Sequence, residues 1–531
     1  MKELWFPRAP LLLAAGYDSL GQVTNGVKCG PDGAALAGHA FGYQFDDIGN
    51  RESASRDDVG SDYTANLLNQ YVGRTVPGRV VAMGEASTDV VIQVNGVGAQ
   101  RQGKLFYRAF TADNTAMAVY SSVEVKGMTS SQTNQAAGHR FTPKTPEGFE
   151  YDLDGNLVQD GRWDYIWDGE NRLIGMETRA NLPVAIPRQK LAFTYDSQSR
   201  RITKTVSTNS GASYFIIQAS SFLYDGWNLV SEIRYLPTQQ RTRATTYVWG
   251  PDLSGTFQGA GGIGGLLASY ASTLNVSHLT FYAFDGNGNV MALVDAGTRQ
   301  AVAQYEYSPF GEVIRASGAQ AKANPFQFST KYCDEETGLD YYGYRYLCPE
   351  AGRWVGRDPI EEDGGENLYT FAHNDAVGLS DMLGLWTSGL HDGLTKIAAS
   401  TYFTTAASGD IGKYDNAVDS EFPPTSPYLV NQQYHFNTTY GTGSDSRNTI
   451  SAARIQKAKD FCDKRLHNDN YAESVKNFGY SIHPVQDITA HGDYPGWVGL
   501  VPHLHNVSGP QLDGAPGSPS DYPDGNRVTG Y

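Results

Sequence analysis

The stretch RWVGRDPIEEDGGENLYTFAHNDAVGLSDMLGL at residues 353–385 divides the chain into two parts of different character. Before it the sequence is rich in Tyr, Gly and Asp and repeats one short pattern. After it the sequence does not repeat and holds seven of the eleven histidines. We therefore expect a domain boundary near residue 385, and we look for a chemical activity in residues 386–531.

Composition agrees with more than one domain. A chain of 531 residues is too long for a single hydrophobic core. It has 18% charged and 40% hydrophobic residues, with 59 Gly and 33 Tyr, which is typical of a turn-rich β protein rather than a disordered one. The net charge of −16 argues against charge-driven binding of nucleic acid by the whole chain.

Cysteines and apolar runs say little about compartment. The four cysteines are too few and too scattered for a disulfide framework and form no CxxC pair, although Cys333 and Cys348 are able to pair if the chain is exported. No apolar run reaches the ~18 residues that span a membrane. The N-terminal MKELWFPRAPLLLAAG is a poor signal peptide, so we interpret it as the start of a fragment whose upstream repeats are missing.

The repeated pattern is an aromatic residue and Asp, then Gly or Asn, then an alternating apolar strand. Asp and Asn cap turns and Gly adopts positive φ, so each unit predicts a β-hairpin whose aromatic residue packs on the next strand. The units begin at Tyr17, Tyr151, Trp167, Tyr195, Leu223 and Phe284. GGIGGLLA at 261–268 lacks the Lys-Ser/Thr of a phosphate-binding loop, so we interpret it as a structural turn.

Together with KYCDEETGLDYYGYRYLCPEAGRW at 331–354, the opening stretch resembles the core-associated module that closes the shell of Rhs/YD-repeat proteins. The resemblance implies a β-rich shell over 1–385 that encloses a variable C-terminal toxin and cuts itself after the final Gly-Leu, here between Leu385 and Trp386. We expect a degenerate repeat start at 1–38, a β-rich inserted module at 39–127, repeats at 128–325 and the cleavage module at 326–385.

The same resemblance assigns the self-cleavage to paired carboxylates. Asp358 in GRDP and Asp381 in DMLGL match the family pair, with Arg357 placed to hold or polarise. Two close carboxylates divide acid and base duties because like charges separate their pKa values. The family usually has Pro after the second Asp, where this chain has Met382. The alternative is that both carboxylates only cap turns.

The C-terminal segment is expected to be mostly α-helical. In SIHPVQDITAH, His483, Asp487 and His491 are spaced four residues apart and so share one face of a helix. Two imidazoles and a carboxylate are a suitable ligand set for zinc. The alternative is a solvated polar face.

This pattern resembles the zinc-dependent phospholipase C/single-strand nuclease superfamily, an all-α fold with up to three zinc ions. The resemblance implies that the new amino terminus at Trp386 binds zinc and that Asp419 also orients the nucleophile, with Asp415 as its rival. The last ligand stays open between His505 and Asp513. The full expected ligand set is Trp386, His391, Asp419, His435, His483, Asp487, His491 and His505.

Three functions follow as hypotheses. The first is an exported Rhs-type toxin that releases a phospholipase C-like zinc phosphodiesterase. The second is a nuclease of the same fold, and the third is a structural or cell-surface repeat protein with an inert tail. The toxin hypotheses imply the chain's own shell, a phospholipid membrane or nucleic acid, an immunity protein and secretion-system components as partners.

Overall fold

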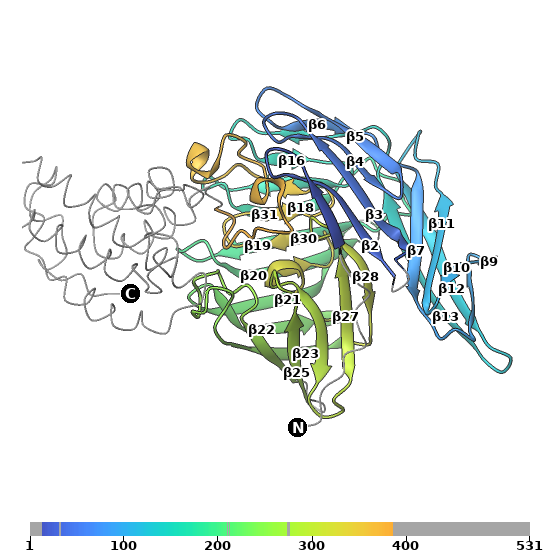
Figure 1. The fold of residues 1–531 in the computed structure, drawn as a ribbon. Coiled ribbons are helices and arrows are strands. Elements are labelled where there is room, and N and C mark those ends of the chain that lie inside the picture. Colours follow the sequence, from blue (N-terminus) through green and yellow to red (C-terminus); the bar gives the residue numbers. More distant parts are fainter. Residues whose placement is uncertain (1–12, 31–32, 210, 212, 273–276, 386–531) are drawn as a thin grey trace, which may run out of the picture. The chain divides into compact units, whose positions relative to one another are not determined.

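The computed structural model describes residues 13–385, apart from 31–32, 210, 212 and 273–276 (Figure 1). Outside 253–259 these residues form one compact unit. Its regular structure is β-strands and four short 3-10 helices. The β-rich fold expected for the shell is confirmed, whereas the helical domain expected at 386–531 lies outside the described residues. Among the described residues, no helix is long and apolar enough to cross a membrane.

The largest element is a 14-stranded antiparallel sheet in which strands neighbour one another in sequence order. This order follows from the repeat, because each hairpin pairs with the hairpins made just before and after it. Its strands are β15 (Glu150–Tyr151), β16 (Leu157–Gln159), β17 (Trp163–Trp167), β18 (Leu173–Thr178), β19 (Gln189–Tyr195), β20 (Arg201–Asn209), β21 (Tyr214–Asp225), β22 (Asn228–Leu236), β23 (Arg241–Trp249), β24 (Leu266–Ser272), β25 (Ser277–Phe284), β26 (Val290–Asp295), β27 (Ala301–Tyr307) and β28 (Val313–Ser317).

In repeat turns such as those at Asp196 and Asp285, the side chain of the Asp closes the turn. At Asp196, Oδ1 accepts the backbone N–H of Gln198 at 2.9 Å and of Arg200 at 3.0 Å, while Oδ2 accepts Nε of Arg200 at 2.8 Å. Asp285 makes the same contacts with Asn287 and Asn289. The side chain therefore replaces missing backbone partners in the turn.

The aromatic residue of the repeat reaches back to the preceding hairpin. Tyr195, at the end of β19, donates its hydroxyl to the carbonyl oxygen of Leu173, at the start of β18, at 2.6 Å. Four other pairs repeat this contact, each joining the end of one strand to the start of the strand before it: Trp167 to Leu157, Tyr224 to Arg201, Trp249 to Leu229 and Tyr307 to Val290.

The N-terminal part forms a seven-stranded sheet in the order β1-β2-β3-β4-β5-β6-β14. Here the repeat is disguised, because Asn66 takes the place of the turn Asp and accepts the N–H groups of Leu68 and Gln70. The strands are β1 (Leu13–Tyr17), β2 (Val23–Cys29), β3 (Ala35–Phe45), β4 (Arg51–Arg56), β5 (Val59–Ala65), β6 (Tyr71–Arg74) and β14 (Glu147–Gly148).

The inserted module is placed differently from the expected 39–127. Because β6 pairs with β14, the chain between them loops out, so the insertion runs from β7 to β13. Residues 39–74 belong to the seven-stranded N-terminal sheet. It comprises two small sheets, β10-β11-β7 and β13-β12-β8-β9. Their strands are β7 (Arg79–Glu85), β8 (Val91–Val94), β9 (Val97–Gly98), β10 (Gln100–Gln102), β11 (Leu105–Thr111), β12 (Val119–Met128) and β13 (Thr133–Thr142).

Residues 326–385 form a small core module that packs on both large sheets. Its four-stranded sheet contains β29 (Tyr332–Asp334), β30 (Leu339–Tyr341), β31 (Tyr346–Cys348) and β32 (Arg353–Trp354). The 3-10 helices are η1 (Pro237–Gln239), which lies outside the module, and within it η2 (Phe328–Thr330), η3 (Glu361–Gly364) and η4 (Ala372–Asn374).

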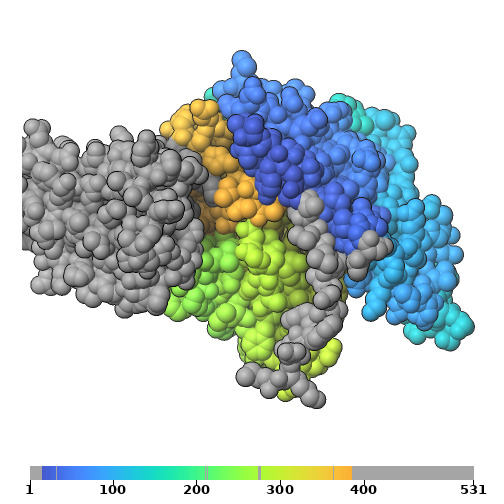
Figure 2. Space-filling view, viewed as in Figure 1, coloured from blue at the N-terminus to red at the C-terminus, as the bar shows by residue number. Residues whose placement is uncertain are grey.

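One hydrophobic cluster joins the core module to the 14-stranded sheet, through residues such as Tyr332 and Leu191, and a second joins it to β2 and β3. A buried ion pair adds to the first contact, since Arg201 Nη1 lies 2.5 Å from Asp334 Oδ2. In the space-filling view the module lies between the N-terminal sheet and the repeat sheet (Figure 2). This packing fixes the positions of the last described residues, 381–385.

Candidate active site at the end of the core module

The segment 381–385 is wrapped around the carboxylate of its own first residue. Asp381 Oδ1 accepts the backbone N–H groups of Leu383 at 3.2 Å, Gly384 at 2.7 Å and Leu385 at 3.1 Å. Gly384 has a φ of +76°, a conformation that suits glycine. Asp381 is only 1% exposed. The carboxylate therefore sets the backbone path directly before the expected cleavage bond.

The side chain of Arg345 is the centre of the site. Its Nη2 lies 2.7 Å from Oδ2 of Asp358 and 3.5 Å from Oδ2 of Asp381. Its Nε donates to the carbonyl oxygen of Gly384 at 2.5 Å, and its guanidinium lies 4.3 Å from the centre of the Trp354 ring. One buried cation thus joins both carboxylates to the segment that precedes Leu385.

Asp358 is held by its backbone at the start of a turn. Its N–H donates to the carbonyl of Leu368 at 3.0 Å, and its Oδ1 accepts the N–H of Ile360 at 3.1 Å, as is usual for Asp before Pro. Burial raises the pKa of Asp358 to about 6, against the opposing effect of Arg345. A carboxyl group with this pKa changes its protonation state close to neutral pH, as a general acid or base must.

A polar cavity of about 470 Å³ reaches the site. Its lining includes Arg345 and Asp358, together with Asn156, Arg172 and Glu361 from other segments. A cavity of this size holds several water molecules. Water therefore has a route to Asp358 through this cavity.

The structure places Arg357 differently from the sequence expectation. Its guanidinium points to the carbonyl oxygen of Asp154, with Nη1 at 3.5 Å, and Arg357 lines the same cavity as Asp358. Arg345, not Arg357, contacts the two carboxylates. Sequence reasoning overlooked Arg345 because it lies in the aromatic run YYGYRYLC. The signal that could have identified Arg345 is a charged residue within a run of buried aromatic residues.

The expected zinc ligands lie outside the described residues, as do Trp386, Asp415 and Asp513. Within 13–385, as far as the chain is described, no group of three or more His, Cys, Asp or Glu side chains is arranged to hold a metal ion. Cys29, Cys333 and Cys348 are free thiols, so the optional Cys333–Cys348 disulfide is not formed.

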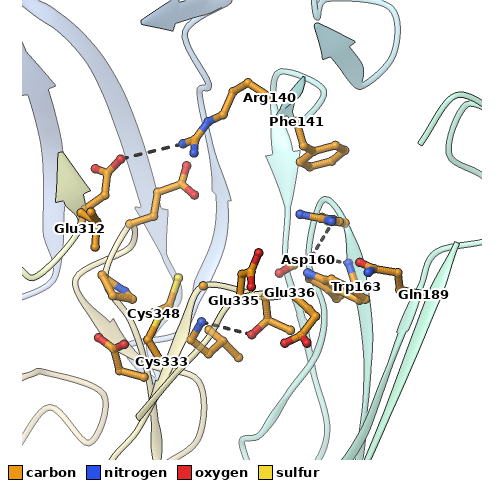
Figure 3. A pocket seen from close by; sticks show the side chains of 18 of the residues that line it. Arg140, Phe141, Asp160, Trp163, Gln189, Glu312, Cys333, Glu335, Glu336 and Cys348 are labelled. Atoms are coloured by element: carbon orange, nitrogen blue, oxygen red, sulfur yellow. Dashed lines mark hydrogen bonds and ion pairs between the residues drawn. The ribbon is translucent and has the colours of Figure 1, made fainter. Parts of the chain in front are cut away.

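A second, larger cavity of about 930 Å³ lies between the core module, the inserted module and the repeat sheet (Figure 3). Charged groups of both signs line it, and Figure 3 shows Glu312 facing Arg140, whose Nη2 lies 3.9 Å from Glu312 Oε1. Burial raises the pKa of Glu147, another lining residue, to about 7 despite its ion pair with Arg74. Acidic side chains outnumber Arg and Lys in its lining.

Comparison with known proteins relates the chain to toxins. No family model matches it. It is 26% identical over 254 residues to the tRNA3(Ser)-specific nuclease WapA of Bacillus spizizenii, covering 47% of this chain and 10% of the relative. It is 30% identical over 250 residues to the double-stranded DNA deaminase toxin A of Burkholderia cenocepacia, covering 45% of this chain and 17% of the relative.

The toxin protein Tse5 of Pseudomonas aeruginosa is 29% identical over 271 residues, which cover 47% of this chain and 19% of that protein. By name, these three relatives are a nuclease, a deaminase toxin and a toxin protein. Their similarity supports the relationship to Rhs-type toxins, and the chain spans about a tenth to a fifth of their length. The solved structure of TcdB2-TccC3 is similar over 70% of this chain and 18% of that chain, with 17% identity and a TM-score of 0.38.

Proposed function

We propose that this chain is the closing part of an Rhs-type toxin shell that hydrolyses its own Leu385–Trp386 bond. The observation that carries the proposal is the placement of Asp358 and Asp381 on one buried guanidinium, that of Arg345. A turn-capping role explains Asp381 Oδ1, but it does not explain why a second buried carboxyl group with a raised pKa lies on the same cation.

In the proposed reaction Asp358 takes a proton from a water molecule that enters through the 470 Å³ cavity. The water oxygen attacks the carbonyl carbon of Leu385, the C–N bond breaks, and Asp358 returns the proton to the leaving nitrogen of Trp386. Asp381 and Arg345 hold residues 383–385 in place throughout. Holding the reacting groups in a fixed geometry lowers the barrier because orientation is arranged before the reaction.

For the released segment we propose a zinc-dependent phosphodiesterase, supported by the ordered ligand types from Trp386 to His491. His483, Asp487 and His491 would hold one ion and the new amino group of Trp386 another. Bound zinc supplies a polarised phosphate and an activated water. The nuclease and deaminase among the relatives favour nucleic acid over phospholipid as the substrate. Phospholipid remains the second candidate, because the superfamily resemblance supports both.

The toxin relationship also suggests an exported protein with an immunity partner and a delivery apparatus. The proposed first partner of the released segment is the chain's own shell. The third hypothesis, a purely structural repeat protein with an inert tail, is less well supported, because the relatives of this chain include enzymes.

The self-cleavage is tested by the intact mass of the purified chain. We expect two fragments that correspond to 1–385 and 386–531, and one uncut chain for Asp358→Asn and for Asp381→Asn. Glu361→Gln is a matched control, because this exposed carboxylate lines the same cavity without contacting the site. A folded wild-type chain that stays whole contradicts the proposal.

The activity of the cleaved chain is tested by adding zinc and comparing single-stranded DNA, RNA and phosphatidylcholine vesicles as substrates. We expect hydrolysis of a nucleic acid and loss of hydrolysis in His483→Ala. Release of phosphocholine or diacylglycerol alone selects phospholipid instead. If none of the three is hydrolysed and no zinc is retained, the inert-tail hypothesis replaces the phosphodiesterase.

A further inference from the structure

Lys331 is a buried lysine that the proposed reaction does not use. It directly precedes β29 and is 6% exposed. Its Nζ donates to the carbonyl oxygen of Met382 and, at 3.0 Å, to that of Gly261. The ammonium group also lies 5.2 Å from the centre of the Tyr342 ring. Its hydrogen-bond partners are thus backbone oxygens, one of which belongs to the segment that ends at Leu385.

The backbone before Lys331 is shaped to direct this side chain. Ser329 and Thr330 have φ values of +48° and +53°, a conformation that residues with a Cβ rarely adopt. The hydroxyl of Thr330 donates to the carbonyl of Gly288 at 2.7 Å and accepts the N–H of Gly264 at 2.9 Å. The turn is therefore held against two other segments, and its strain is retained by those contacts.

The glycine-rich turn at 260–265 forms the other side of this contact. Asp252 Oδ2 accepts the N–H groups of Ala260 at 2.7 Å and Gly262 at 3.0 Å, which fixes the turn. Gly261 has a φ of +60°, and a Cβ at this position would lie 2.5 Å from the carbonyl oxygen of Met382. Only glycine allows the turn to approach the cleavage segment this closely.

Three consecutive carbonyl groups before Leu385 each receive one donor. Lys331 donates to Met382, the backbone N–H of Tyr344 donates to Leu383 at 3.0 Å, and Arg345 donates to Gly384. Arg345 and Tyr344 belong to one loop of the core module, whereas Lys331 directly precedes β29 and contacts Gly261 as well as the segment. Loss of Lys331 would leave the first of these carbonyl groups without its charged donor.

We infer that Lys331 is a positioning residue for self-cleavage, which clamps Met382 against the glycine-rich turn so that residues 383–385 keep their contacts with Asp381 and Arg345. The inference rests on the proposed self-cleavage and adds to it a residue and a loop outside the carboxylate pair. Because a charged donor binds a carbonyl more strongly than a neutral one, the clamp is strongest when the lysine is protonated.

The charge state of Lys331 depends on three groups that face it. Asp381 on the cleavage segment and Asp252 beside the glycine-rich turn favour the protonated form, and the Tyr342 ring is the third neighbour. Burial outweighs the two carboxylates and lowers the pKa of Lys331 to about 8. The clamp is therefore expected to weaken as pH rises through 8.

The test follows cleavage of the full chain after dilution from urea, by quenching samples in detergent and separating them on gels. We expect Lys331→Met to cleave at least tenfold more slowly than the wild type. We also expect the wild-type rate to fall above pH 8 and the Lys331→Met rate to lack this fall. A lysine that only supports the fold would not change the shape of the pH profile.

Lys204→Met is the matched control, because Lys204 is equally buried but pairs with Asp334 and Glu336, away from the cleavage segment. Gly261→Ala disturbs the contact between Met382 and the glycine-rich turn without changing Lys331, so it should also slow cleavage. This variant keeps the inference testable if Lys331→Met does not fold. Wild-type rates in both Lys331→Met and Gly261→Ala overturn it. Failure of the wild type itself to cleave contradicts the proposed function instead.

Discussion

The Oδ2 atom of Asp358 lies 2.7 Å from Nη2 of Arg345, in a site where both side chains are almost fully buried. The same nitrogen lies 3.5 Å from Asp381, so the arginine is shared by two carboxylates that are 23 positions apart in the sequence. Removing one partner of such a buried group leaves the others without compensation.

Arg345 and Arg357 should behave differently when their charge is removed. Arg345→Met should abolish cleavage and destabilise the unit by about 3–5 kcal/mol, because two buried carboxylates lose their cation. Arg357→Gln should change the free energy of unfolding by no more than about 0.5 kcal/mol, and the cleavage rate by no more than that energy corresponds to. The reason is that Arg357 makes only a 3.5 Å approach to the carbonyl of Asp154. Intact mass and urea unfolding measure both effects. Loss of cleavage in Arg357→Gln alone would restore the assignment made from sequence.

The cleavage rate should rise with pH through a midpoint near 6. The pKa of Asp358 is raised to about 6, so below that pH the group is protonated and cannot accept a proton from water. Refolding by dilution at pH 4.5 to 7.5, with the cut fraction followed over time, measures this profile. Glu361→Gln should leave the midpoint unchanged. A rate that falls over this range would show that Asp358 acts first as an acid.

Asp340 should make the unit less stable as pH rises. Its Oδ2 is buried and has no hydrogen-bond partner, and burial raises its pKa to about 8. Folding then favours the protonated acid, so the stabilisation is complete below the unfolded pKa and is lost as pH rises through 8. Asp340→Asn should therefore raise stability at pH 9 by about 1–3 kcal/mol and have little effect at pH 4.

Urea unfolding of the uncleaved Asp358→Asn chain measures this effect on a single species. Glu335→Gln serves as the control, because this exposed carboxylate forms an ion pair on the surface with Lys322. An equal effect of Asp340→Asn at both pH values would show that packing, rather than titration, determines the change.

Zinc retention should depend on the cut. The nitrogen of Trp386 becomes an amine only when the bond before it is broken, and an amine binds zinc whereas an amide does not. We expect the uncut Asp358→Asn chain to retain fewer zinc ions per molecule than the cleaved wild type, as measured by elemental analysis. His483→Ala and His491→Ala should each reduce zinc further. Insertion of Gly between Leu385 and Trp386 should lower hydrolysis; unchanged hydrolysis would disprove the coupling.

The repeats were predictable from sequence because each turn uses a local rule. Asp or Asn closes its own turn within four residues, so the pattern is visible in any one unit. The inserted module was misplaced because Asn66 disguises one such unit and because the β6–β14 pairing joins residues that are far apart. The boundary of the inserted module is set by this long-range strand pairing, so the local sequence pattern does not predict it.

The carboxylates of the site were predictable from motifs, whereas their partners were not. Arg345 and Lys331 contact the segment 381–385 across distances of 36 to 51 positions, through packing of the core module. The sequence around Arg345 or Lys331 does not predict which residues these side chains contact. The glycine-rich turn is followed by strand β24, and its contact with Met382 is visible only in the fold.

The backward hydrogen bonds of the aromatic residues also fix an order of events. In every such pair the acceptor, such as Leu173 for Tyr195, precedes the donor in the chain, so it has already left the ribosome when the donor arrives. The sheet can thus be wound from its first hairpin onward during synthesis, without waiting for later residues. Residues 381–385 follow all of these hairpins in the chain, and their clamp needs segments contributed by earlier turns. Scission after Leu385 would then act as a completion signal, given only by a chain whose preceding hairpins have been correctly laid down.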